Sequence, residues 1–100
     1  MSAPAFDAVI HAPGRLQICA LLSAAEAEFG TVRDTIGVSD SVLSKHVKVL
    51  EEAGYVAIRK APFAGRQRTW LSLTSAGRKA FAAHVAELTR LASMTLPSGA

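Results

Sequence analysis

The residues best suited to chemistry in this 100-residue chain are serines and lysines near its middle. They supply hydroxyl and ammonium donors at Ser39, Ser41, Ser44, Lys45 and Lys48. Such groups donate hydrogen bonds to phosphate oxygens and to the edges of bases. This set therefore favours contact with a nucleic acid rather than the making or breaking of bonds.

The donors can share one surface only if they lie on a helix, and the sequence predicts one over residues 40–53. Ser39 and Asp40 can cap the first turn, and Gly54 favours termination. Between them Leu43, Val47 and Leu50 recur at spacings of four and three, which places them on one buried stripe. The donors then occupy the opposite, solvent-facing side. A solvated amphipathic helix without a ligand is the alternative explanation.

Beyond Gly54 the spacing of apolar residues changes from helical to alternating. Val56 and Ile58 alternate with polar or small residues, and so do Leu71 and Leu73 further along. A β-hairpin is therefore predicted, with a connecting loop over residues 60–68.

The predicted loop is cationic and rich in residues that favour turns. It contains Pro62 and Gly65 together with Lys60, Arg66 and Arg68. Arginine at the tip of a hairpin suits the narrow, negative minor groove of DNA. Alternatively, the charges keep an exposed edge strand from pairing with other chains.

Two helices are predicted upstream of the serine and lysine set. Residues 13–25 are rich in alanine and leucine and predict a largely buried helix. Residues 31–36 predict a shorter helix, and Gly37 opens a connection of the length found between the helices of a helix-turn-helix. A very short strand is expected over residues 28–30, with Phe29 inserted into the core.

Several segments in this order resemble the winged-helix MarR/ArsR superfamily. They are LSKHVKVLEEAGYV (residues 43–56), RTW (68–70) and LTSAG (73–77). The resemblance covers about residues 13–91 and is nearest to the short, single-domain MarR-like transcriptional regulators. The fold class expected is mainly α with a small β-hairpin (α+β), a winged helix-turn-helix with terminal dimerisation helices.

The resemblance also implies roles for these segments. The helix after Ser39 would enter the major groove of double-stranded DNA, the hairpin would reach the minor groove or backbone, and the terminal helices would form a homodimer. We expect Ser41 and Ser44 to contact bases, Lys45 and Lys48 to contact phosphates, and Arg66 and Arg68 to act from the hairpin. Arg15 and Arg33 are further candidates for phosphate contact.

Charge is distributed unevenly along the chain. Residues 40–80 hold eight Lys or Arg against three acids (8 − 3 = +5), whereas residues 1–39 come to 2 − 4 = −2. A net charge of +3 therefore conceals a basic half, which is the electrostatic pattern of a nucleic-acid-binding protein.

The terminal segments carry apolar residues that a small core would not cover. We expect one domain over residues 1–100, with a core at 13–74, dimerisation segments at 5–12 and 75–95, and a flexible tail at 96–100. The residues predicted at the dimer seam are Phe6, Ile10, Phe81, Val85, Leu88 and Leu91. Alternatively, the last helix completes the core of its own subunit and the protein is monomeric.

Other chemistry finds little support in the sequence. The sequence lacks a phosphate-binding glycine loop, paired carboxylates in a cleft and a nucleophile beside a histidine. We therefore expect no enzyme and no cofactor. His11, His46 and His84 lie far apart in sequence, so no metal site is predicted. We expect His46 to pack between helices, and contact with a phosphate is the alternative. No apolar run suits a membrane and Cys19 is the one cysteine, so a cytoplasmic protein is expected.

These observations favour a sequence-specific DNA-binding regulator, expected to be a homodimeric repressor that binds a short inverted repeat. A small-molecule effector would act through the dimer seam, but no residue identifies one. The alternative is a winged helix that binds protein or RNA, because a fold does not fix a function.

Overall fold

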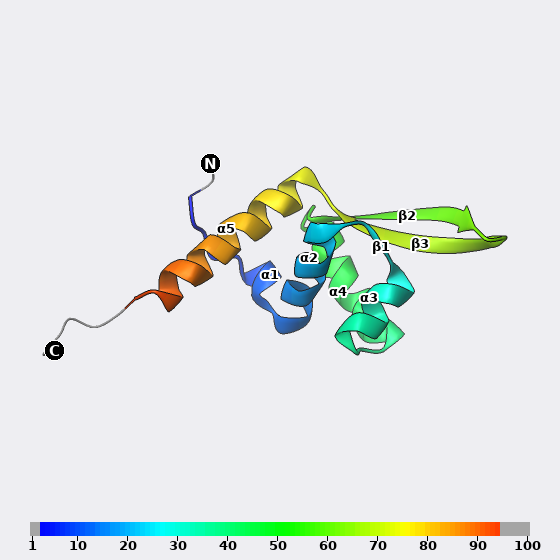
Figure 1. The fold of residues 1–100 in the computed structure, drawn as a ribbon, viewed down its shortest axis with the longest axis horizontal. Helices are drawn as coiled ribbons and strands as arrows, with labels where there is room; N and C mark the ends of the chain where they lie inside the picture. The colour runs from blue at the N-terminus through cyan, green and yellow to red at the C-terminus, as the bar shows by residue number, and fades with distance from the viewer. Residues whose placement is uncertain (1–2, 95–100) are drawn as a thin grey trace, which may run out of the picture.

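A computed structural model describes residues 3–94 and contains five helices and a three-stranded antiparallel sheet (Figure 1). In chain order the elements are α1 (Ala8–His11), α2 (Pro13–Ala24), β1 (Ala27–Glu28), α3 (Phe29–Ile36), α4 (Asp40–Glu52), β2 (Val56–Phe63), β3 (Arg66–Leu73) and α5 (Ser75–Ala92). The mainly helical α+β class predicted from the sequence is confirmed. The predicted tail at 96–100 lies outside the described residues.

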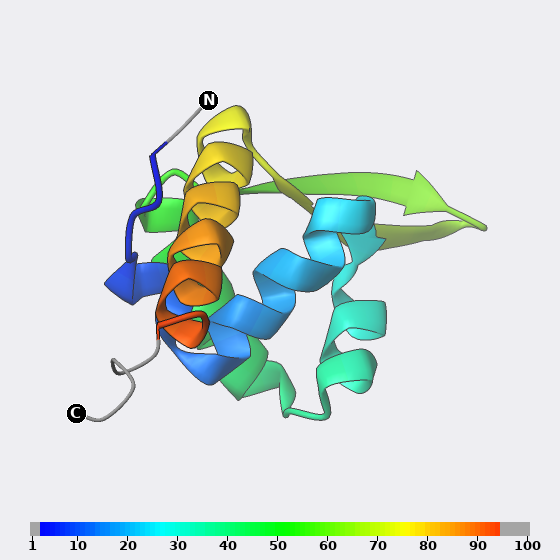
Figure 2. The same cartoon turned by 60° about the vertical axis from the view of Figure 1, so that its left-hand side comes forward.

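The core lies where α2, α3 and α4 meet the base of the sheet. Ile18 and Leu22 from α2, Leu43 and Leu50 from α4, and Leu71 from β3 are all fully buried. Figure 2 shows the hairpin leaving this body on one side, while α5 crosses the other side. The fold thus leaves a face of α4 and most of the hairpin accessible.

Local sequence explains where α4 begins and ends. The Ser39 side chain accepts a hydrogen bond from the backbone N–H of Val42 at 3.2 Å, which satisfies one of the donors left open in the first turn. Gly54 adopts a φ of 82°, a left-handed conformation that glycine takes without strain. The helix therefore ends at Glu52, one residue before the predicted limit.

The predicted loop over residues 60–68 is wrong, because both strands continue to a two-residue turn. β2 and β3 pair in register from Val56–Leu73 out to Phe63–Arg66, and Ala64 and Gly65 form the turn with φ of 52° and 78°. Positive φ at both positions matches the twist of a tight hairpin. Pro62 fits within β2 because β2 is an edge strand, where a missing N–H costs little.

The short strand before α3 is present, although it is shifted. Ala27 and Glu28 pair with Leu71 and Trp70 of β3, so β1 ends before the predicted residues 29 and 30. Phe29 instead begins α3 and packs against the core.

The N-terminal segment contributes to the core of its own subunit, contrary to our expectation for Ile10. That side chain is fully buried, so it cannot lie in a seam between two copies. The cause is the placement of α1 beside α2, α4 and α5, where Asp7 caps α1 through hydrogen bonds from the N–H groups of Val9 and Ile10.

Candidate nucleic-acid interface

The exposed side of α4 gathers the polar side chains that the sequence singled out. Ser41, Ser44, Lys45 and Lys48 are exposed, whereas Val47 on the opposite side is buried. Ser39 precedes the helix, and its hydroxyl lies 3.2 Å from that of Ser41 while it also caps the helix. The structure therefore brings Ser41, Ser44, Lys45 and Lys48 onto one surface. Ser39 also stabilises the start of the helix.

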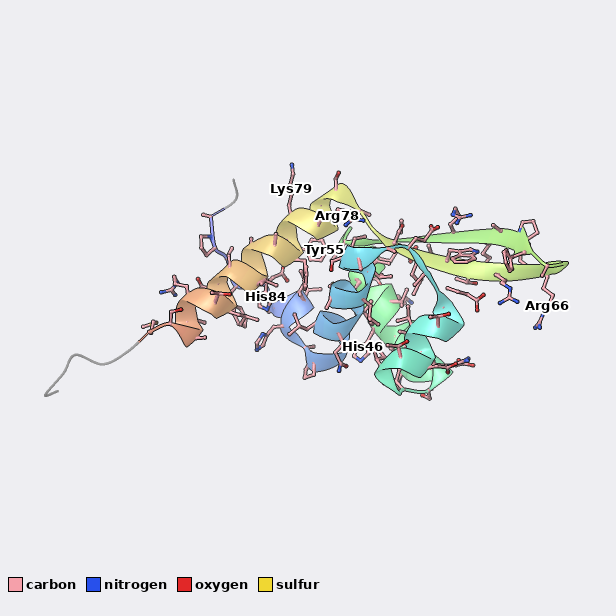
Figure 3. All side chains as sticks on the ribbon, in the orientation of Figure 1. His46, Tyr55, Arg66, Arg78, Lys79 and His84 are labelled. Carbon is pink, nitrogen blue, oxygen red and sulfur yellow. The ribbon has the colours of Figure 1, made fainter. Side chains whose placement is uncertain are left out.

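Four exposed cations on α4 and the hairpin form no ion pair within residues 3–94. They are Lys45 and Lys48 on α4, and Lys60 and Arg66 on the hairpin. Figure 3 shows Arg66 at the far end of the hairpin. Cations of this kind are able to contact phosphates without first breaking an ion pair.

The two arginines predicted for the hairpin have different environments. Arg68 lies inside β3 opposite Ala61 and forms an ion pair with Glu28 of β1. Its side chain is 32% exposed, and its Nε atom is buried without a partner among the described residues. Arg68 therefore links the hairpin to β1 through its ion pair. The expectation that Arg68 lies at the tip of the hairpin is wrong.

A second ion pair fixes the same hairpin from β2. Arg59 donates to the carboxylate of Glu26 at 2.7 Å, and this hydrogen bond raises the pKa of the guanidinium. The Arg59 guanidinium also lies 5.8 Å from the centre of the Trp70 ring, and Phe63 packs against that ring at 6.4 Å. Arg59 and Arg68 thus orient the hairpin, so the charge count of residues 40–80 overstates the cations open to a ligand.

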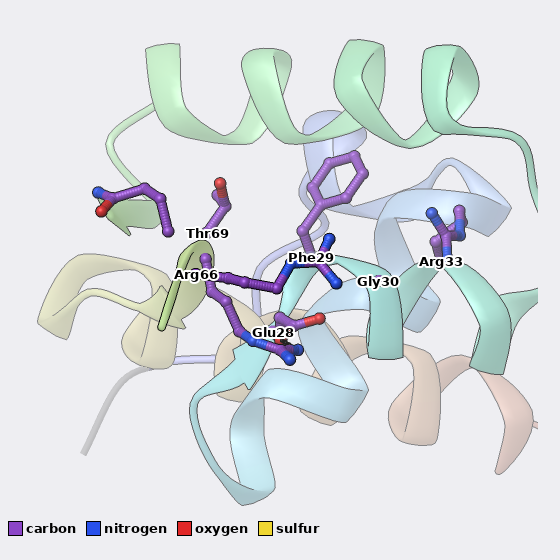
Figure 4. A pocket seen from close by; sticks show the side chains of 8 residues that line it. Glu28, Phe29, Gly30, Arg33, Arg66 and Thr69 are labelled. Atoms are coloured by element: carbon purple, nitrogen blue, oxygen red, sulfur yellow. Dashed lines mark hydrogen bonds and ion pairs between the residues drawn. The ribbon is translucent and has the colours of Figure 1, made fainter. Parts of the chain in front are cut away.

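A recess of about 470 Å³ separates α3 from the hairpin (Figure 4). Arg66 and Arg68 line it from β3, and Glu28 of β1 lines it together with Gly30 and Arg33 of α3. Arg33 donates to Asp34 at 2.9 Å and to Asp40 at 2.7 Å, and these bonds raise its pKa. Arg33 is therefore neutralised locally, and Arg66 is the lining cation without an acidic partner in residues 3–94.

His46 is held between α4 and α2, in agreement with the packing role that we favoured. It is half-buried, and a Cβ atom placed on Gly14 would lie 2.5 Å from its Nε2 atom. Burial lowers the pKa of this imidazole, with a smaller contribution from the charge of Arg15. Glycine at position 14 therefore allows α2 to approach the helix that carries the polar face.

The other two histidines meet although 73 residues separate them. His11 Nδ1 and His84 Nε2 are 3.2 Å apart, and the backbone N–H of Asp7 donates to His84 Nδ1 at 2.9 Å. The Tyr55 hydroxyl donates to the Asp7 carboxylate at 2.6 Å. This His84 cluster joins α1, α5 and the turn after α4, and sequence spacing gave no signal of it.

Burial shifts the pKa values of His84 and Cys19. His84 is fully buried, and its pKa is lowered first by burial and then by the charge of His11. Burial raises the pKa of the Cys19 thiol to about 11, so the thiol stays protonated near neutral pH. Among residues 3–94, no group of three His, Cys, Asp or Glu side chains is arranged to hold a metal ion.

Apolar side chains remain exposed along α5 and the segment before α1. Phe6 is 53% exposed, Val85 40% and Leu91 43%, while Phe81 and Leu88 are half-buried and Phe81 packs on the core. We call these five residues the α5 seam, and Ile10 is not one of them. None of the helices described between residues 3 and 94 has the length and apolar character needed to cross a bilayer.

Comparison with known proteins identifies relatives over most of the chain. The family model described as a winged helix DNA-binding domain matches residues 15–92. The uncharacterised protein MJ0432 of Methanocaldococcus jannaschii is 36% identical over 78 residues, which cover 77% of this chain and 85% of that protein.

Solved structures of regulators share the fold. A transcriptional regulator homologue from Pyrococcus horikoshii superposes with a TM-score of 0.78 at 27% identity, over 84% of each chain. A MarR-family transcriptional regulator from Enterococcus faecalis superposes with a TM-score of 0.71, over 84% of this chain and 76% of the other; at 19% identity it shows likeness of fold alone.

Proposed function

Because the chain belongs to the family of winged helix DNA-binding domains, we propose that it is a transcriptional regulator that binds specific sites on double-stranded DNA as a homodimer. The observation that carries this proposal is the exposed side of α4. Ser41, Ser44, Lys45 and Lys48 lie there together, and the two lysines have no acidic partner within residues 3–94.

In the proposed complex α4 lies in the major groove. Its serine hydroxyls are short and can donate to or accept from base edges, whereas the longer lysine side chains reach the phosphates on either side. Arg66 extends from the end of the hairpin toward the neighbouring minor groove, where a narrow groove concentrates negative potential. Arg66 also lines the recess between α3 and the hairpin, which would lie beside the DNA backbone.

A homodimer would place two copies of α4 on one face of the duplex. The α5 seam is a suitable contact, because it carries exposed apolar side chains. Figure 1 shows that α5 runs away from the hairpin. Dimers of this kind bind half-sites about 34 Å apart, one turn of B-DNA. The proposed operator is therefore a short inverted repeat.

We propose repression as the mode of regulation. A dimer bound over a promoter would block polymerase by occupying its site. A small-molecule effector would act by changing the angle between the two α4 helices. The Tyr55–Asp7 hydrogen bond offers a route for this change, since it joins the turn after α4 to the segment that precedes α1.

Binding to a protein or to RNA is the competing function. The two lysines and Arg66 favour a polyanion over a protein surface, and α4 has the diameter that the major groove of B-DNA admits. The deep, narrow major groove of an RNA duplex does not admit such a helix.

The proposal is tested by selecting duplexes from a random pool and measuring their affinity by fluorescence anisotropy at several salt concentrations. We expect an enriched inverted repeat whose binding weakens steeply with salt. The Lys45→Ala/Lys48→Ala variant should bind all duplexes more weakly, with a salt slope reduced by about 0.9 for each phosphate that the protein no longer neutralises. Lys79→Ala, an exposed lysine on α5, is the matched control and should behave as wild type. Folded protein that enriches no duplex would exclude sequence-specific DNA binding.

A further inference from the structure

Two valines are exposed on α4 although its outward side is otherwise polar or charged. Val42 is 40% exposed and Val49 is 39% exposed, whereas Val47 of the same helix is 3% exposed. The seven-residue spacing of Val42 and Val49 corresponds to nearly two full turns, so both lie on the same flank. Lys45 lies between them on that flank.

Val42 is held in a fixed position at the start of the helix. It is the third residue of α4, and its backbone N–H donates to the Ser39 hydroxyl that caps the helix. A β-branched side chain in a helix strongly prefers one rotamer, so the two methyl groups of Val42 point in a defined direction. Ser41 and Lys45 beside it are exposed, and 40% of the Val42 surface is itself open to solvent.

A rigid apolar group on this surface has one counterpart in the major groove. Base edges there present hydrogen-bond donors and acceptors, and the apolar exception is the methyl group at C5 of thymine. Methylated cytosine carries the same group at the same ring position. Contact between valine and this methyl removes apolar surface of both partners from water.

We infer that Val42 contacts the C5 methyl group of a pyrimidine in each half-site and so specifies thymine at that position. The inference rests on the proposed function, since it requires α4 to lie in the major groove. The N-terminal part of a recognition helix makes most contacts with base edges, which favours Val42 over Val49. Val49 lies about 10 Å further along the helix axis, at a rise of 1.5 Å per residue.

Replacing thymine by uracil removes the methyl group and leaves base pairing and hydrogen-bonding groups unchanged. In the duplex enriched from the random pool, each thymine of one half-site is replaced in turn by uracil, and affinity is measured by fluorescence anisotropy. At one position of the half-site, the change from thymine to uracil should weaken binding of the duplex by wild-type protein about fourfold. This is the effect of losing one methylene-sized apolar contact.

The same duplexes are then measured with two matched valine variants. Val42→Ala should bind the thymine and uracil duplexes equally well, whereas Val49→Ala should retain the fourfold preference for thymine. Circular dichroism shows whether each variant is folded. This comparison isolates the contact, because the weakening caused by the protein change and that caused by the DNA change should not add.

A second set of duplexes tests whether the protein recognises the methyl group itself, on methylated cytosine as well as on thymine. The sensitive T·A pair is replaced by C·G, with and without a methyl at C5 of the cytosine. If Val42 contacts the methyl itself, methylation should recover about fourfold in affinity for wild type and nothing for Val42→Ala. Recovery that is equal in both proteins would overturn the inference.

The outcomes separate this inference from the proposed function. An enriched duplex with no uracil position that depends on Val42 would reject the role of Val42 and leave DNA binding intact. Failure to enrich any duplex would reject the proposed function, and the role of Val42 with it.

Discussion

Arg66 and Arg68 lie two residues apart on β3, yet they should affect different properties of the protein. Arg66 is exposed beside the turn, so Arg66→Ala should weaken DNA binding and leave the free energy of unfolding unchanged. Arg68→Ala removes the ion-pair partner of the mostly buried Glu28, so it should lower the free energy of unfolding by about 1–2 kcal/mol. Urea unfolding and anisotropy measured on both variants test the distinction.

The paired change Glu28→Gln/Arg68→Gln is the control for the second effect. It removes both charges together, so it should destabilise the protein less than Arg68→Ala alone. If Arg68→Ala instead weakened DNA binding with no loss of stability, the arginine would have to leave Glu28 to contact DNA.

His84 should make stability depend on pH. Its pKa in the folded protein lies below the ordinary value of 6.5, so the unfolded chain binds the proton more readily. The stabilisation is complete above pH 6.5 and should be lost as pH falls below it, by at most about 1.4 kcal/mol per pH unit for this one site. His11, Asp7 and Glu87 are the titratable groups around it, and urea unfolding between pH 5 and 8 measures the dependence.

His84→Asn is the variant that separates this site from the others. An asparagine side-chain oxygen can replace Nδ1 as the acceptor for the N–H of Asp7 but does not titrate. The variant should therefore show a shallower pH dependence, and the remainder should come from His46, whose pKa is also lowered. An unchanged pH profile would show that His84 is not the titrating group.

At the scale of elements, the junction between α4 and α5 depends on Gly77. A Cβ atom at this position would lie 2.1 Å from the backbone oxygen of Tyr55, a contact that real structures do not contain. Gly77→Ala should therefore push α5 away from the turn after α4 and lower the free energy of unfolding by about 1–3 kcal/mol. Ser75→Ala, an exposed change in the same turn, should stay within about 0.5 kcal/mol of wild type in urea unfolding. Equal stability of the two variants would mean that the junction can relax.

Elements whose limits are set by neighbouring residues were predictable from the sequence. For α4, the cap at Ser39, the spacing of Leu43, Val47 and Leu50, and the stop at Gly54 are all local signals, and the helix was predicted to within one residue. The resemblance to winged-helix regulators, drawn from local motifs, is likewise confirmed. The hairpin loop was predicted too long because Pro62 and the cations suggested irregular structure, and only the pairing shows that β2 is an edge strand.

Contacts between distant segments were not predictable in this way. The acids that bind Arg59 and Arg68 precede them by 33 and 40 residues, so the charge pattern counted these arginines as available. The meeting of His11 and His84 and the burial of Ile10 likewise depend on how α1 packs. The polar face of α4 was predictable because its spacing follows from the helix, whereas the exposure of Val42 required the packed structure.

At the scale of the whole molecule, the described elements separate two surfaces. The exposed side of α4 and the hairpin carry the lysines and Arg66 that have no acidic partner within residues 3–94, whereas the α5 seam carries exposed apolar residues. The His84 cluster lies between these surfaces and ties α5 to the turn after α4. A change in the packing of α5 would therefore shift the end of α4. The proposed effector could act on α4 through this contact.

The separation of the two surfaces predicts that dimerisation and DNA contact can be uncoupled. Val85→Asp/Leu91→Asp places two carboxylates in the α5 seam, and burying them in a dimer would be costly. Sedimentation equilibrium should show a dimer for wild type and a monomer for this variant, while the circular dichroism of both stays the same. Affinity for the inverted repeat should fall toward that for a single half-site, since the two α4 helices no longer bind as one unit. Lys79→Asp changes charge on the same helix outside the seam and should remain dimeric. A monomeric wild-type protein would instead mean that α5 serves only its own subunit, and the operator would then be a single site.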